Sequence, residues 1–199
     1  MKTLNSIANI RTGYTFREKV EEVAVGGNAY VVQIKDVRKI HQDGISFNLP
    51  VVSLPQINWT GKDNAFVSAG SVLLPARGGY FKASYLVPTD SASMPVVVSS
   101  QFLVLTPTKH ILAEFLCWIL NQPAMQRALI ESSQGTSMPM LRAETLKKLK
   151  IAVPSLKTQQ HIIELNRLWE HEQQLTQALL KNRENMLQGV FQQLLKETN

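Results

Sequence analysis

Residues 134–165 read QGTSMPMLRAETLKKLKIAVPSLKTQQHIIEL and show how the chain is organised. A small polar loop around Gly135 leads into a short helical segment, and the apolar run Leu149–Val153 then predicts a strand that stops at Pro154. Ser155 opens a long helix, because from there onward the chain has no proline and Gly189 is its only glycine. We therefore predict a compact domain over residues 1–154 and one long helix over residues 155–199.

The compact part is predicted to be an α+β domain. Short apolar runs, separated about every ten residues by Gly, Pro, Asn or Asp, indicate the strands of a curled or barrel-like mixed sheet. The runs are residues 29–34, 44–54, 71–76, 85–87, 96–98 and 102–105. The apolar spacing then changes to that of helices over residues 111–120 and 123–131, which we expect to pack on the sheet.

The last segment has apolar residues every three to four positions, which is typical of an amphipathic helix. Some 40 helical residues extend about 60 Å, too far for both ends to be buried against a domain of this size. The stripe therefore needs a partner helix, in this chain or in another copy. Asn182 interrupts it, either to fix the register between helices or as a solvent-flanked position. The predicted partner-contacting residues are Leu165, Leu168, Leu175, Leu179, Asn182, Met186, Val190 and Leu194.

The net charge of +6 is confined to one part of the chain. Residues 1–154 contain 16 Lys or Arg and 10 Asp or Glu, whereas residues 155–199 contain five of each. A basic domain with a neutral helix suggests that the domain meets a polyanion and the helix meets protein. No apolar run reaches the ~18 residues that cross a bilayer. We expect a cytoplasmic protein without membrane contact, in which the single Cys117 is a buried, inert thiol.

The sequence lacks the motifs of the common catalytic sites. Gly78-Gly79 is followed by Tyr-Phe-Lys, so there is no phosphate-binding P-loop, and no Gly-x-Ser-x-Gly elbow is present. One cysteine and four scattered histidines do not make a zinc site. The chain is therefore predicted to bind no metal or cofactor itself and to act as a binder without catalysis.

Three loops carry the residue types that contact DNA. They are residues 11–17, 77–82 and 132–137, which combine glycines that allow close approach with Arg, Lys, Tyr, Ser and Thr. Gly-rich turns with neighbouring aromatic residues also close the ends of barrels, which is the alternative interpretation. The candidate DNA-binding residues, including two basic residues after the first strand, are Arg11, Tyr14, Thr15, Arg17, Lys35, Arg38, Arg77, Gly78, Tyr80, Lys82, Ser133, Gly135 and Thr136.

The order of these segments resembles the specificity subunits of type I restriction-modification systems. The similar segments are LNSIANIRTGYTF (4–16), YVVQIKD (30–36), GSVLLPARG (70–78), SSQFLVL (99–105) and residues 135–160. The resemblance implies a target-recognition domain for double-stranded DNA, followed by a long helix. It also implies a partner methyltransferase subunit that uses S-adenosylmethionine to modify adenine, and, in some systems, a restriction subunit.

This chain differs from the usual subunit, which has two recognition domains and two antiparallel helices. It has one of each, so we expect either a half-subunit that forms a homodimer and reads a bipartite site, or a truncated piece. A second hypothesis is a module that occupies the methyltransferase through its helix without reading DNA. A third is a small-molecule enzyme, which only the glycines at 78–79 suggest.

Overall fold

The computed structural model describes residues 1–40, 45–88, 94–135 and 138–197, which form two compact units, Met1–Ile163 and Glu164–Asn199. The strands are β1 (Lys2–Thr3), β2 (Ala8–Thr12), β3 (Ala29–Val32), β4 (Asn48–Pro50), β5 (Gln56–Ile57), β6 (Phe66–Val67), β7 (Val72–Pro75), β8 (Ser84–Val87), β9 (Val96–Val98), β10 (Phe102–Pro107) and β11 (Lys150–Ile151). The helices are α1 (Ile34–Ile40), α2 (Ala113–Leu120), α3 (Pro123–Glu131), α4 (Ala143–Lys148) and α5 (Leu156–Glu197).

A five-stranded sheet in the order β2-β10-β7-β8-β4 lies at the centre of the first unit. Its pairs are antiparallel, apart from the parallel pair β4 and β8. Side chains alternate between the two faces of a strand, and β7 shows this directly. Val72 and Leu74 pack in one core cluster, whereas Leu73 packs in another on the opposite face. Both faces of this sheet are therefore buried.

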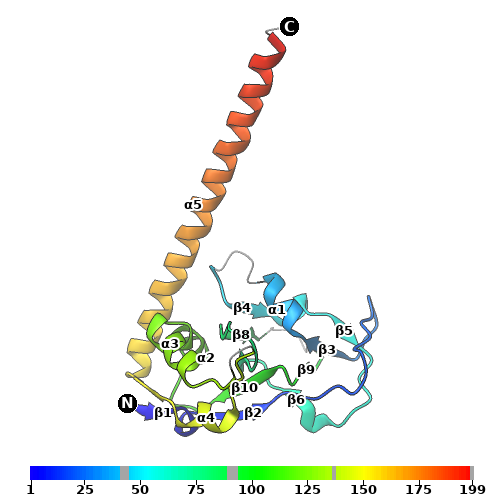
Figure 1. Cartoon of the computed structure of the whole chain (residues 1–199), viewed down its shortest axis with the longest axis vertical. Helices are drawn as coiled ribbons and strands as arrows, with labels where there is room; N and C mark the ends of the chain where they lie inside the picture. Colours follow the sequence, from blue (N-terminus) through cyan, green and yellow to red (C-terminus); the bar gives the residue numbers. More distant parts are fainter. Residues whose placement is uncertain (41–44, 89–93, 136–137, 198–199) are drawn as a thin grey trace. The chain divides into compact units, whose positions relative to one another are not determined.

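The two faces meet different layers. On one face, Phe115 and Leu120 of α2 and Leu129 of α3 share the cluster of Val72 and Leu74. On the other face lies a four-stranded sheet in the order β5-β3-β9-β6, whose Val96 and Val98 pack into the second cluster. Figure 1 shows α2 and α3 on one side of β10, and β3 with α1 on the other.

The predicted α+β class, with mixed sheets and a long C-terminal helix, is confirmed. In the described residues the strands form two open face-to-face sheets and the small β1–β11 pair, not a closed barrel. The strand predicted over residues 29–34 was too long, because β3 ends at Val32 and α1 begins at Ile34. Asp36 lies inside this helix. Its carboxylate accepts a hydrogen bond from the backbone N–H of Gln33 at 2.9 Å, as a capping acid does.

The start of α5 shows why serine at 155 and glutamine at 159 suit the sequence SLKTQ (155–159). The Ser155 Oγ accepts the backbone N–H of Thr158 at 3.2 Å, which caps the first turn. Gln159 is fully buried; its Oε1 accepts the Leu112 N–H at 2.8 Å, and its Nε2 donates to the Pro154 carbonyl at 2.9 Å. These bonds tie the first two turns of α5 to the first unit, which extends to Ile163. Among the described helices, none is long and apolar enough for a membrane span.

Candidate DNA-binding surface

Three connecting segments lie at one end of the five-stranded sheet. β2 and β7 both pair antiparallel with β10, so the segments that follow β2 and β7 lie beside the turn that precedes β10. Backbone hydrogen bonds connect them: Ser100 N donates to Tyr14 O and Ala76 N donates to Gln101 O, each at 2.7 Å. The predicted loops at 11–17 and 77–82 are thus joined through the turn at 99–101, which the sequence analysis did not single out.

The third predicted loop joins the second. Gly78 N donates to Pro139 O at 2.9 Å, and Arg77 forms an isolated β-bridge with Met140. Gln134 and Met140 exchange two backbone hydrogen bonds of 2.8 and 2.9 Å across Gly135. The structure therefore brings residues from all three loops to one end of the sheet. Thr136, another predicted contact, lies outside the described residues.

Glycine is required at one point of this surface by a close backbone approach. A Cβ on Gly13 would lie 2.2 Å from the Ser99 carbonyl oxygen and 2.5 Å from that of Val98, closer than any real Cβ contact. Gly78 is required for a different reason, because its φ of 91° is in the left-handed region. The two glycines thus set the paths of the backbones that carry Tyr14 and Arg77.

Gly13→Ala will lower the free energy of unfolding by about 2–4 kcal/mol, because the added methyl must push apart two backbones. Gly79→Ala is the matched control: nothing lies within 4 Å of its Cβ position, and its effect will be below about 1 kcal/mol. Denaturant unfolding of both variants measures the difference. Equal stability of the two variants would contradict the close approach at Gly13.

Arg77, Tyr80, Thr15 and Arg17 are exposed at this end of the sheet. Half of the Tyr80 surface is exposed, and the partial burial of the remainder raises the pKa of its hydroxyl above the usual value. The hydroxyl is therefore a hydrogen-bond donor at neutral pH. Exposed guanidinium and tyrosine hydroxyl groups can each contact phosphates or base edges.

Arg11 and Lys82 have contacts within the fold. The Arg11 guanidinium donates to the carbonyl of Phe66 at 2.5 Å and to that of Asn64 at 3.3 Å, which holds the turn before β6. Lys82 Nζ donates to the Asn121 carbonyl at 3.3 Å and lies over the Phe47 ring. That Arg11 and Lys82 contact DNA stays a prediction. Each of the two residues also has a structural role within the fold.

The remaining predicted residues are more peripheral. Lys35 and Arg38 are exposed on α1, which follows β3. The end of β3 lies beside the turn at 99–101, because Ser99 N donates to Val32 O at 3.0 Å. Lys35 forms an ion pair with Glu22, and this hydrogen bond raises the Lys35 pKa. The Ser133 hydroxyl donates to Ile130 O at 2.6 Å and caps the end of α3.

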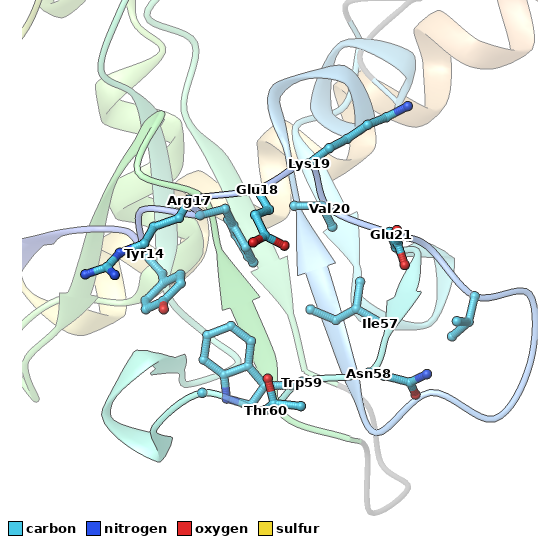
Figure 2. Close-up of a pocket in the computed structure, with 13 residues that line it drawn as sticks. Tyr14, Arg17, Glu18, Lys19, Val20, Glu21, Ile57, Asn58, Trp59 and Thr60 are labelled. Carbon is cyan, nitrogen blue, oxygen red and sulfur yellow. The ribbon is translucent and has the colours of Figure 1, made fainter.

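A groove of about 540 Å³ lies next to the first loop. Figure 2 shows Tyr14 beside Trp59 there, and their ring centroids are 4.9 Å apart in an edge-to-face arrangement. The groove also carries Arg17, Lys19 and Glu18, so its charge is mixed. Trp59 was not among the predicted site residues, although a tryptophan in the polar turn NWTG (58–61) is a signal that could have indicated it. No group of three potential metal ligands occurs in the described residues.

The residues predicted to contact a partner helix all lie on α5. In the second unit, the seven apolar ones are between 42% and 67% exposed, and Asn182 is exposed as well. Monomeric proteins rarely expose an apolar patch of more than about 300–600 Å², and a stripe that runs along some 30 residues exceeds this. The structure thus defines a mixed α+β domain with a loop surface at one sheet end, and a long helix that carries an exposed apolar stripe.

Comparison with known proteins shows the family. Residues 1–182 match the family model described as the type I restriction modification DNA specificity domain, and the chain belongs to this family. No curated protein matches the sequence significantly.

Three solved structures share the fold. One comes from a description of complex assembly and conformational transition of the type I R-M system; it is 15% identical, with a TM-score of 0.60, over 90% of this chain and 42% of that one. The S subunit from M. genitalium is 12% identical, with a TM-score of 0.53, over 85% and 38%. The HsdS subunit from Thermoanaerobacter tengcongensis is 15% identical, with a TM-score of 0.54, over 86% and 36%. The chain thus spans about two fifths of the length of these proteins.

Proposed function

We propose that this chain is a DNA-recognition subunit of a type I restriction-modification system. The observation that carries the proposal is the family match over residues 1–182, together with a single surface formed by all three predicted loops. The exposed side chains on that surface are cationic or hydrogen-bonding, which suits phosphate and base-edge contacts. The chain performs no catalysis itself and directs a methyltransferase subunit, which binds S-adenosylmethionine, to adenines in its site.

The exposed face of α5 supports a second part of the proposal, a homodimer. A two-fold pair of identical recognition units reads the same half-site twice, in inverted orientation. Each recognition unit then sets one half-site, and the paired helices set the gap between the two. In a host that has a restriction subunit, the same complex also directs cleavage.

The test is a map of N6-methyladenine in cells that express this chain with the type I modification subunit encoded beside it. We expect methylation at one bipartite motif only when both proteins are present. The double variant Arg17→Ala/Arg77→Ala will remove most of it, because both side chains are exposed at the recognition end. Lys109→Ala is the control, since Lys109 is exposed but follows β10 at the opposite end of the sheet.

The alternative is a module that occupies the methyltransferase through α5 without reading DNA. In that case the Arg17/Arg77 variant would leave complex formation and cellular methylation unchanged. The location of the basic excess within residues 1–154 favours recognition, because a helix-mediated mimic needs no positive domain.

A further inference from the structure

The apolar stripe of α5 has two charged residues at its centre. At about 100° per residue, the exposed large apolar side chains from Leu165 to Leu194 fall within roughly 80° of a line through Leu165, whereas the exposed Leu195 lies about 120° away. Glu172 and Arg183 lie within about 20° of that line, whereas Asn182 is about 100° away on the flank. The stripe consists of Leu165, Leu168, Trp169, Leu175, Leu179, Leu180, Met186, Leu187, Val190, Phe191 and Leu194, all exposed.

Two charges in the middle of an apolar face restrict how that face can be covered. A charge that is buried without a counter-charge is strongly unfavourable. In a parallel, in-register pair of identical helices, Glu172 would face Glu172 and Arg183 would face Arg183. In an antiparallel pair, an acidic position on one helix can face a basic position on the other. The charge pattern thus selects an antiparallel arrangement.

We propose that α5 pairs antiparallel with α5 of a second copy, in a register where Glu172 faces the partner's Arg183 and the reverse. The two-fold axis passes between Gln177 and Ala178. This inference rests on the homodimer of the proposed function and specifies its geometry. Glu172 and Arg183 are positioned to form two identical ion pairs, one on each side of the axis.

The apolar residues fit the same register. In this register Leu165 lies directly opposite the partner's Val190. Leu168 lies one residue away from a position opposite the partner's Met186, and Leu175 lies one residue away from a position opposite the partner's Leu179. Shifting one helix by seven residues in either direction places Arg183 opposite an apolar residue, Leu165 or Leu179. It also places Glu172 opposite Thr176 or Val190. Those registers lose both ion pairs.

The register also fixes a distance. Ile163, the last residue of the compact unit, lies opposite the partner's Gln192. At about 1.5 Å per residue, the two Ile163 positions are roughly 44 Å apart along the paired helices. This length corresponds to about 13 base pairs at 3.4 Å per step. Deleting seven residues between Glu172 and Arg183 keeps the face and both ion pairs and shortens the distance by about 10 Å.

The first test is a charge swap, measured on the full chain by sedimentation equilibrium without DNA. Glu172→Arg and Arg183→Glu will each weaken dimerisation about tenfold or more, because each creates two like-charge contacts. The double variant Glu172→Arg/Arg183→Glu will restore the affinity to within about threefold of the parent. The register would be overturned if the double variant lost as much dimer affinity as the two single variants together, or if the single variants had no effect.

The second test reads the register directly by disulfide formation. Leu168→Cys and Met186→Cys will cross-link when the two variants are mixed, and neither will cross-link alone. The parent chain, whose single Cys117 is buried, is the control. Cross-linking of each variant with itself would show a parallel pair and overturn the register while leaving the homodimer intact. A parent chain that sediments as a monomer would instead remove the homodimer, and the register with it.

Discussion

Replacing Leu175 and Leu179 with aspartate will abolish the proposed homodimer and leave a monomer. Both side chains are more than half exposed on α5 and lie next to the proposed two-fold axis. Two carboxylates placed there would be buried against apolar residues of the partner helix, which is unfavourable. The loss of two central apolar contacts alone weakens an interface by roughly 100-fold or more. Sedimentation velocity over a range of concentrations measures the change.

The matched control is Gln174→Asp/Ala178→Asp, which introduces the same two charges at the same spacing. These positions lie about 140–180° from the centre of the stripe, so the change will leave the dimer intact. Thermal unfolding of the first unit will be the same in both variants, because residues 1–163 form a unit of their own. If both variants dissociate alike, helix propensity or net charge is responsible, and the apolar face is not the interface.

Arg77→Ala will reduce affinity for the recognised DNA site by about 1–3 kcal/mol, or roughly 5–150-fold, if its guanidinium reads a base edge. The residue is exposed at the point where two loops meet, held by the bridge to Met140 and the bond from Gly78 to Pro139. The loss will be larger for the specific site than for an unrelated duplex. Fluorescence anisotropy at about 150 mM salt, on both duplexes, measures the two affinities.

Lys109→Ala removes the same charge at the opposite end of the sheet and will change neither affinity by more than about twofold. An equal, small loss on both duplexes after Arg77→Ala, with a salt slope reduced by about one, would show that Arg77 contacts phosphate only. No loss on either duplex would remove Arg77 from the interface.

The positions of most helices and strands along the chain were predictable, because they depend on the local periodicity of apolar residues. The helix at 123–131 matches α3 at both ends, and the run at 96–98 is β9. The short helix α1 was missed, since its seven residues, with apolar positions at 34, 37 and 40, span only about two turns, which is too short for a clear periodic signal. Asp36, which follows the run predicted as a strand, is the capping acid of that helix.

The candidate site was predictable only as a set of loops. Gly, Arg, Tyr and Lys together indicate a binding loop, but partners distant in sequence decide which side chains are bonded within the fold. Arg11 bonds to carbonyls more than 50 residues away, and Lys82 to Asn121, and neither contact has a local signature. The turn at 99–101 and Trp59 were missed for the same reason. Their positions follow from strand pairing, which sequence periodicity does not specify.

The central claim is that this chain reads DNA sequence as a two-fold pair. The most direct measurement is selection from random duplex DNA at near-physiological salt, with the chain mixed with a type I modification subunit. We expect enrichment of two short inverted half-sites at one fixed spacing. Deleting seven residues between Glu172 and Arg183 of α5 will shorten this spacing by about three base pairs. Recovery of DNA without any enriched sequence would contradict the account and show that charge alone drives binding.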